Sequence, residues 1–231
     1  AEGEATLLSY DQVETLFHEF GHGLHGLMTQ IRYPRFAGTS GSPRDYTEFP
    51  AQFMEHYASQ PQVLEVYAKH AETGEVIPQE LVDKIRAAST HNQGFKTTEY
   101  IAASVLDLGW HNLDPNEAAA VEDAKQFEDE TMAAYGKPGE IESRYRSPYF
   151  AHIFAGGYSA GYYAYLWSEI LDADGFTAFL EAGDIYDPEL AGRLKENVYE
   201  AGGLRDADVL YRDFRGKDPS IEPLLEIRGL N

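Results

Sequence analysis

The residues with the clearest chemical potential are His18-Glu19-Phe20-Gly21-His22, an HExxH pattern. Histidines four positions apart on a helix share one face, so both imidazoles can bind one zinc ion. Glu19 then stands beside the metal and can take a proton from the coordinated water, whose pKa falls to roughly 7. The pattern predicts one Zn²⁺ per chain and the chemistry of a metallopeptidase. It disfavours the alternative of two unrelated histidines, because all three chemical positions are filled.

The segment around this pattern has the features of an amphipathic helix. Ser9 and Gln12 form a capping-box pair at its start. Glycines inside it weaken the helix locally and indicate close packing against another element. We therefore expect a helix from about residue 10 to residue 30. Its apolar stripe comprises Val13, Leu16, Phe17, Phe20, Leu24, Leu27 and Met28.

Zinc needs a third protein ligand, and the metzincin pattern HExxHxxGxxH does not supply it. His25 occupies the glycine position and Met28 the last histidine position. The alternative is a carboxylate on a second helix, where Glu48 and Glu55 lie seven residues apart and hence on one face. One of them can ligate while the other holds a ligand histidine, and spacing alone leaves the choice open. His25 itself is better explained as a buried, hydrogen-bonded histidine than as a ligand.

An aromatic and glycine-rich segment between residues 152 and 165 is the second candidate for chemistry. Amide hydrolysis develops an oxyanion, and a tyrosine hydroxyl or histidine N–H directed at that oxygen stabilises it. The glycines would let the loop close over a bound peptide. The alternative is an aromatic helical core, which we favour for Tyr163, Leu166 and Trp167. The segment combines His152 with Tyr158, Tyr162, Tyr163, Tyr165, Gly156, Gly157 and Gly161.

Helical patterns dominate the rest of the chain, and no stretch shows sustained two-residue alternation. With no repeat, low-complexity tract or linker, the sequence predicts one mostly α-helical unit over residues 1–231. A loop is expected at 32–43 and another at 136–148, with a turn region at 72–78. Further helices are expected at 45–59, from Pro61, and at 79–89, 97–111, 116–135, 175–182, 188–201 and 206–214.

Composition excludes several classes of function. The chain has 231 residues, no cysteine and a formal net charge of −21. Without cysteine there is no disulfide scaffold, no cysteine nucleophile and no cysteine metal site. The negative charge argues against nucleic acid and anionic membrane surfaces as partners, because both require clustered Lys and Arg. No apolar run reaches the length of a membrane-spanning helix.

Several motifs together resemble the thimet oligopeptidase family of zinc peptidases, and most closely its bacterial peptidyl-dipeptidase (dipeptidyl carboxypeptidase) branch. The similarity runs through nearly the whole chain and covers the C-terminal catalytic portion of that family. It rests on segments 15–22, Gly38-Thr39, Asp45-Tyr46, 48–52, 91–95, His152 to Trp167 and 210–216.

The resemblance implies roles for individual residues. It makes Glu48 the third zinc ligand beside His18 and His22, with Glu55 supporting the ligands. His25 is expected to support them too, because it lies one further turn along the zinc face of the helix. The resemblance assigns His152, Tyr158 and Tyr165 to catalysis with Glu19. It assigns substrate binding to Tyr162, Gly38 and Thr39. Arg144, Arg146 and Lys96 are candidate contacts for a substrate carboxylate, although each is more simply a surface charge.

The resemblance also implies a function. We expect a zinc peptidase that releases dipeptides from the C-termini of oligopeptides, within a helical catalytic half that forms one wall of a deep substrate channel. The alternatives are an endo-acting oligopeptidase of the same family and a zinc- or peptide-binding fragment that is inactive without a partner chain. The family consists of longer proteins, so an N-terminal segment or partner chain is expected to complete the channel. We expect a cytoplasmic or periplasmic bacterial protein, with the cytoplasm favoured and the native N-terminus missing from the chain.

Overall fold

The computed structural model describes residues 7–230, and helices account for nearly all of its regular structure. Within that range there is no β-strand, only an isolated antiparallel bridge between Lys69 and Val76. The predicted mostly α-helical class is confirmed. No helix among the described residues is both long and apolar enough to cross a membrane.

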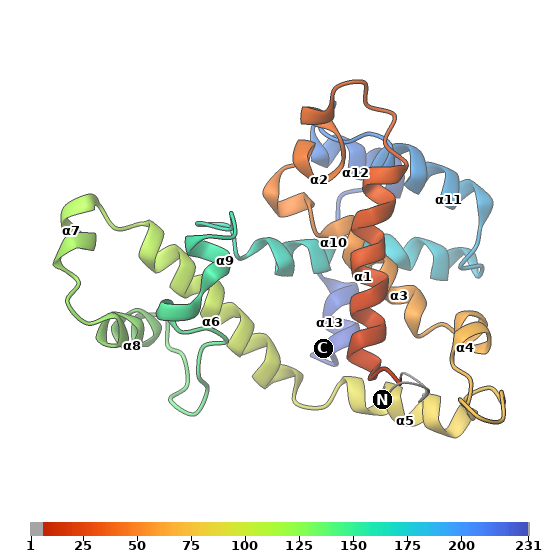
Figure 1. Ribbon diagram of the computed structural model, residues 1–231, viewed down its shortest axis with the longest axis horizontal. Helices are drawn as coiled ribbons and strands as arrows, with labels where there is room; N and C mark the ends of the chain where they lie inside the picture. The colour runs from red at the N-terminus through yellow and green to blue at the C-terminus, as the bar shows by residue number, and fades with distance from the viewer. Residues whose placement is uncertain (1–6, 231) are drawn as a thin grey trace. The chain divides into compact units, whose positions relative to one another are not determined.

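The chain divides into two compact units, each described here by itself (Figure 1). Unit 1 takes in described residues up to His91 and from Trp167 to Gly229. Its helices are α1 (Tyr10–Leu27), α2 (Gly38–Gly41), α3 (Phe49–Ala58), α4 (Pro61–Tyr67), α5 (Gln79–Ser89), most of α10 (Ala164–Ala182), α11 (Pro188–Leu194), α12 (Ala207–Arg215) and α13 (Glu222–Arg228).

Unit 2 comprises Asn92–Leu166, together with Leu230. It contains α6, α7, α8, α9 and the first residues of α10. Because unit 1 is built from two separated stretches of chain, a search for linkers in the sequence does not indicate this division. The bounds are α6 (Gln93–His111), α7 (Pro115–Ala120), α8 (Ala124–Ala134) and α9 (Ala151–Phe154).

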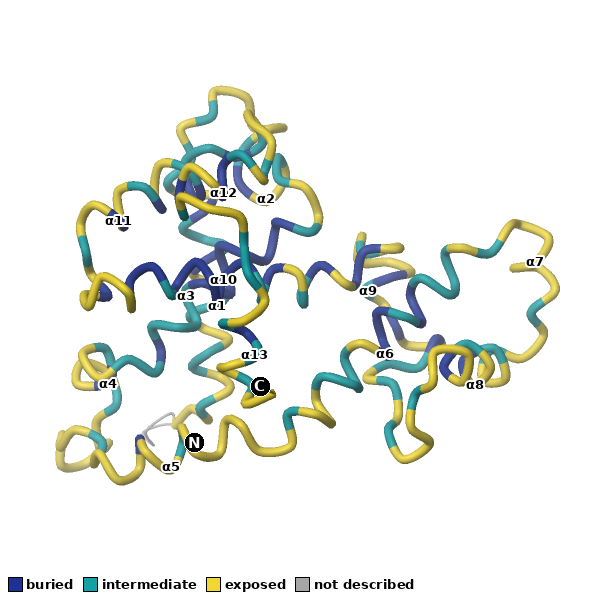
Figure 2. The backbone as a smooth tube through the Cα atoms, turned by 180° about the vertical axis from the view of Figure 1, so that it is seen from behind, coloured by how far each residue is buried: buried dark blue, intermediate teal, exposed yellow. Residues whose placement is uncertain are grey.

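An aromatic core holds unit 1 together. Phe49 and Phe53 on α3 are fully buried and contact aromatic rings from α10 and α12. The buried parts of α3 and α10 appear dark blue in Figure 2. Burying a phenylalanine side chain is worth about 1.5–3 kcal/mol relative to exposure, so this cluster anchors the helices that carry the candidate metal ligands. It comprises Phe49, Phe53, Phe176, Phe179, Tyr211 and Phe214 with flanking apolar residues.

Several predicted bounds are confirmed and others are wrong. Helix α5 spans the predicted residues, and α1 begins as predicted but ends three residues early, at Leu27. The predicted helix at 116–135 is two helices, because Val121 is extended and the Asp123 side chain caps α8. The helix expected only at 175–182 begins at Ala164, and α13 was not predicted.

Candidate metal centre and aromatic cluster

Close packing of α1 against α3 brings the HExxH residues to the second helix. A Cβ added at Gly21 would lie 2.7 Å from Ala51 Cα and 2.8 Å from the Pro50 carbonyl oxygen, so only glycine allows this approach. The predicted capping box is present, with the Ser9 N–H donating to Gln12 Oε1 at 2.9 Å and the Gln12 N–H to Ser9 Oγ at 3.3 Å. The cap satisfies backbone groups at the start of α1, and the packing at Gly21 turns the face with His18 and His22 toward Glu48.

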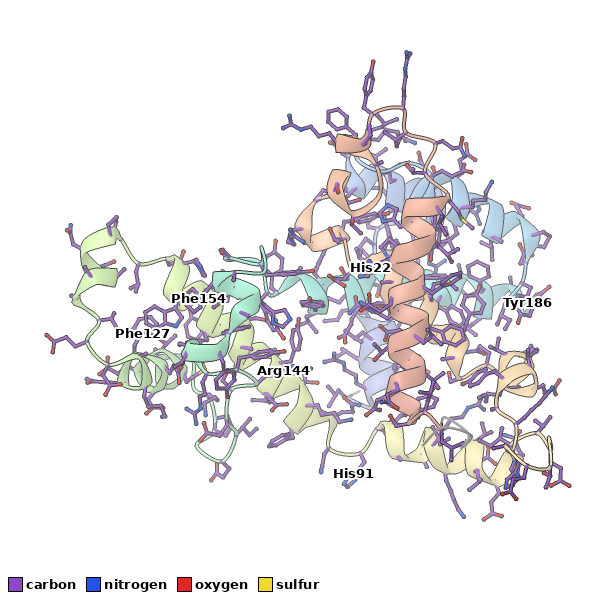
Figure 3. All side chains as sticks on the ribbon, viewed as in Figure 1. His22, His91, Phe127, Arg144, Phe154 and Tyr186 are labelled. Atoms are coloured by element: carbon purple, nitrogen blue, oxygen red, sulfur yellow. The ribbon has the colours of Figure 1, made fainter. Side chains whose placement is uncertain are left out.

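The two histidines converge on one carboxylate oxygen. The Nε2 atoms of His18 and His22 each lie 3.3 Å from Glu48 Oε2. Ligand atoms of these three residues all fall within 4.8 Å of one another. Glu48 is buried at the N-terminus of α3, where the helix dipole favours a negative charge. Figure 3 labels His22 on α1.

Glu55 lies further along α3 and contacts the other ring nitrogen of His18. Its Oε1 lies 2.6 Å from His18 Nδ1. When Nδ1–H donates to Glu55, a neutral His18 presents a lone pair on Nε2 to the Glu48 carboxylate, and two acceptors then face each other. A proton or a metal cation resolves that contact. Burial lowers the pKa of His18, but the hydrogen bonds to Glu48 and Glu55 outweigh it and raise the pKa to about 10.

The donor set fits zinc. Two imidazole nitrogens and one carboxylate make the three-ligand arrangement of catalytic zinc sites, which leave a fourth position open. The carboxylate on a ligand histidine, here Glu55 on His18, is the usual means of fixing its tautomer and orientation. The structure therefore brings together the predicted ligands His18, His22 and Glu48 and places Glu55 behind one of them.

Glu19 and His25 occupy different surroundings on α1. Glu19 is exposed beside His18 and makes no hydrogen bond or ion pair within residues 7–230. His25 is buried, as predicted, and burial together with His22 lowers its pKa to about 4. Neither of its ring nitrogens has a hydrogen-bond partner among the described residues, so the expected hydrogen bonding is not found. Its ring packs edge-on against Tyr199.

Gly38 and Thr39, the other predicted substrate residues in unit 1, form the short helix α2. Gly38 has a left-handed backbone (φ 49°). A Cβ added at Gly38 would lie 3.4 Å from Gly26 Cα of α1. Thr39 is exposed. Their role in substrate binding stays a prediction.

Unit 2 gathers the predicted catalytic aromatic residues into one cluster. The rings of Tyr158 and Tyr165 stack at 5.1 Å, and His152 lies 6.2 Å and 6.3 Å from them. Tyr162 is 5.6 Å from His152 but is buried, and burial raises the pKa of its hydroxyl. Tyr162 therefore belongs to the packed base of the cluster, whereas Tyr158 and Tyr165 are only half-buried.

Some expectations for this segment are wrong. Tyr163 and Trp167 were assigned to the aromatic core, yet they are 40% and 42% exposed in the structure.

Of the candidate contacts for a substrate carboxylate, Arg146 forms ion pairs within unit 2, with Glu128 at 3.3 Å and with Glu142 at 2.7 Å. Lys96 is exposed on α6.

Two buried carboxylate interactions were not predicted. His56 Nε2 lies 2.6 Å from Asp172 Oδ1. Burial raises the pKa of Asp172 to about 6 despite the opposing charge of His56. In unit 2, Asp107 accepts hydrogen bonds from the backbone of residues 160 and 162. The partners are more than fifty residues apart in each case, so no local pattern reveals them.

A cavity of about 410 Å³ in unit 1 is lined by none of the three metal-group residues. Tyr46 and Tyr211 contribute to its wall. We therefore assign the candidate site from the donor chemistry of His18, His22 and Glu48 rather than from this hollow.

The group of His18, His22 and Glu48 on a helical scaffold is typical of a metallopeptidase, and comparison with known proteins shows the family to which the chain belongs. The model for peptidase family M3 matches residues 1–230, and the chain belongs to that family. It is 47% identical over 232 residues to dipeptidyl carboxypeptidase of Escherichia coli and 45% over 231 residues to that of Salmonella typhimurium. It is 37% identical over 230 residues to Escherichia coli oligopeptidase A. The resemblance inferred from the motifs is confirmed.

The alignments cover nearly all of this chain but only about a third of each relative. They include 100% of this chain but only 34% and 33% of the two dipeptidyl carboxypeptidases. For oligopeptidase A, the alignment covers 99% of this chain and 33% of the relative. The chain thus spans about a third of the length of the relatives that it matches.

Proposed function

We propose that the protein to which this chain contributes is a zinc-dependent peptidase that releases dipeptides from the C-termini of oligopeptides. The observation that carries the proposal is the convergence of His18, His22 and Glu48 in a chain that is 47% identical to a dipeptidyl carboxypeptidase. Those three residues would hold one Zn²⁺ per chain. The cytoplasm or periplasm of a bacterium remains our expectation for its location.

Zinc bound there would supply Lewis acidity toward a peptide carbonyl and lower the pKa of water to about 7. The chain's own part is proton transfer by Glu19. Its exposed carboxylate can remove a proton from the attacking water as the water oxygen bonds to the carbonyl carbon. It can then deliver that proton to the amine nitrogen as the C–N bond breaks, so one group serves both steps.

We propose that His152, Tyr158 and Tyr165 contact the substrate and stabilise the developing oxyanion. The support is their clustering within unit 2 and their partial exposure, which leaves polar atoms accessible. A donor of this kind typically contributes about 10²–10³ in rate. Tyr162, which is buried, would support Tyr165 by packing rather than by touching the peptide.

We further propose that additional polypeptide, an N-terminal segment or a partner chain, completes the substrate channel. The relatives are about three times as long as this chain. In addition, α1 exposes an apolar stripe on the face opposite its histidines, where Leu16, Phe20 and Leu27 are each more than half exposed. Covering such a stripe is a recurring role of an interface.

The specificity is tested with matched peptides that differ only at the C-terminus. The complete polypeptide is incubated with a zinc-supplemented buffer and a peptide carrying either a free carboxylate or an amide. We expect stepwise loss of dipeptides from the free peptide and slow cleavage of the amidated one. Internal cleavage at equal rates on both peptides would instead indicate an oligopeptidase, the activity class of the 37% identical relative.

A further inference from the structure

Asp107 is a buried acid in unit 2 whose carboxylate is fully used. It lies on α6 with 0% of its surface exposed. Its Oδ1 accepts the Ala160 N–H at 2.9 Å, and its Oδ2 accepts the Tyr162 N–H at 2.8 Å. His111, one helical turn further along α6, hydrogen-bonds through Nδ1 to the Asp107 carbonyl oxygen at 2.9 Å, and the same nitrogen lies 2.8 Å from Oδ1. A buried carboxylate is retained only when such donors surround it.

The turn that Asp107 binds contains a strained backbone conformation at Ala160. Ala160 has φ 53°, a left-handed conformation that a residue with a Cβ adopts at a cost in strain. The same turn is closed by the Gly161 N–H to the Tyr158 carbonyl at 2.9 Å and by the Ala164 N–H to the Gly161 carbonyl at 3.0 Å. Strained backbone persists where surrounding contacts over-determine it, and the Asp107 bonds supply those contacts.

A second residue of α6 binds the backbone of Tyr162 as well. The hydroxyl of Tyr100 donates to the Tyr162 carbonyl oxygen at 2.9 Å, while Asp107 accepts from the Tyr162 N–H. Tyr100 and Asp107 are seven residues apart and therefore share one helix face. Helix α6 thus holds both the N–H and the carbonyl group of Tyr162.

The turn carries the aromatic residues of the proposed catalytic cluster. Tyr158 precedes it and Tyr165 follows it in the first turn of α10, and their rings stack across it. The Tyr158 N–H also donates to the His152 carbonyl oxygen at 2.9 Å, which ties the histidine to the same loop. A shift of the turn would therefore move all three side chains together.

We propose that Asp107 is a positioning residue for the peptidase reaction, acting through the turn at residues 159–163 and not by contact with substrate. The inference rests on the proposed role of Tyr158 and Tyr165 in catalysis. Misplacing catalytic groups by about 1 Å can lower the rate by about 10²-fold, so the effect of losing the anchor is measurable. Its signature is a fall in kcat with metal content unchanged.

The experiment uses Asp107→Asn in the complete zinc-loaded polypeptide. The side-chain NH₂ of asparagine would face one of the two backbone N–H groups of the turn. That replacement removes one hydrogen bond and places two donors against each other. We expect kcat to fall about 10–100-fold with a smaller change in KM, and zinc per chain to stay at the parent value. Hydrogen exchange at Ala160 and Tyr162 should accelerate, and this readout does not depend on activity.

Glu128→Gln is the matched control. Glu128 is also a buried acid in unit 2, 4% exposed, and it accepts a backbone hydrogen bond from the Ser147 N–H at 2.6 Å. It holds the backbone at Ser147 and contacts Arg146, and within the described residues it makes no hydrogen bond or ion pair with the turn. The change should therefore lower Tm while exchange at Ala160 and Tyr162 keeps the parent rate. Equal falls of kcat in both variants would assign the effect to general destabilisation and overturn the proposal.

Two further comparisons separate the inference from the proposed function on which it rests. If Tyr158→Phe or Tyr165→Phe slows turnover but Asp107→Asn does not, despite faster exchange in the turn, the positioning role is wrong. If both tyrosine variants keep full turnover, the proposed role of the cluster is wrong instead. In the Tyr165→Phe background, Asp107→Asn should cost less in kcat than it does alone.

A milder variant covers the case in which Asp107→Asn does not fold. His111→Leu removes the contacts of Nδ1 with the Asp107 carbonyl oxygen and with Oδ1, and it leaves both bonds to the turn. We expect a few-fold fall in kcat and faster exchange at Ala160 and Tyr162. Unchanged exchange together with unchanged kcat would overturn the proposal.

Discussion

At the scale of single residues, Glu48 and Glu55 show how position separates two identical carboxylates. Glu48 meets the Nε2 atoms of both histidines, whereas Glu55 meets only Nδ1 of His18. Nδ1 is the ring nitrogen left over when Nε2 binds a metal. These positions support Glu48 as the proposed zinc ligand and Glu55 as the residue that orients His18, a division that spacing alone left open.

Substituting each glutamate by glutamine should separate these roles. Glu55→Gln keeps a hydrogen-bond acceptor for His18 and should weaken zinc binding by about 10–100-fold at most. Glu48→Gln removes a charged ligand and should weaken it by more. Zinc affinity measured by competition with a chromophoric chelator decides between them. The reverse order of effects would show that Glu55 is the ligand.

The protonation of His18 predicts how zinc binding depends on pH. Its pKa of about 10 lies above the ordinary value of 6.5, so protonation stabilises the metal-free fold fully below pH 6.5, and this contribution is lost toward pH 10. Zinc must displace that proton. Calorimetry at pH 7.5 in buffers of different ionisation enthalpy should report release of about one proton per zinc. Release of none would show that His18 is already neutral.

At the scale of secondary-structure elements, the approach of α1 to α3 makes the site. The segment between the two helices contains the short helix α2, and Gly21 permits the contact of α1 with α3 at Ala51. A methyl group at Gly21 would press on the backbone of α3, which cannot rotate aside. The helices would have to separate, and Glu48 would move away from the histidines.

Gly21→Ala should therefore destabilise the chain and weaken zinc binding together. Overpacking of this kind costs about 1–3 kcal/mol. Gly23→Ala is the matched control, since the nearest atom to its added Cβ is Phe20 Cδ2 at 4.0 Å, and alanine favours the helix. Chemical denaturation and zinc titration of both variants provide the measurement. Equal stability of the two would contradict the packing account.

The elements differ in how far the sequence could predict them. The cap at Ser9 and the apolar stripe located α1, because both are local features. Helix α10 is apolar around much of its circumference, so it has no amphipathic period, and its start among the tyrosines was missed. The break between α7 and α8 depends on the cap by Asp123, which a continuous helical pattern concealed.

The site shows the same limit. The HExxH spacing located His18, Glu19 and His22, since an i to i+4 relation is local. Choosing Glu48 over Glu55 needed either the family resemblance or the observed packing of two helices. No local pattern linked Asp107 to the aromatic cluster, because the turn whose N–H groups it accepts lies more than fifty residues away.

At the scale of the whole molecule, the exposed stripe on α1 predicts a covering polypeptide. Leu16→Ser and Leu27→Ser should change the stability of this chain alone by no more than about 0.5 kcal/mol, because both side chains are already exposed. In the complete polypeptide the same changes should lower Tm clearly. Val66→Ser, an exposed substitution on α4, is the control. Equal effects in both contexts would mean that nothing covers the stripe.

The central claim is that the HExxH group and Glu48 make a zinc peptidase in which Glu19 moves the proton. The most direct measurement is peptide turnover by Glu19→Gln in the complete polypeptide, with zinc content measured on the same sample. Glutamine keeps the size of the side chain and leaves His18, His22 and Glu48 intact. We predict one zinc per chain and a rate lower by about 10²–10⁴-fold or more. A variant that holds zinc and cleaves peptides at nearly the parent rate would contradict the account.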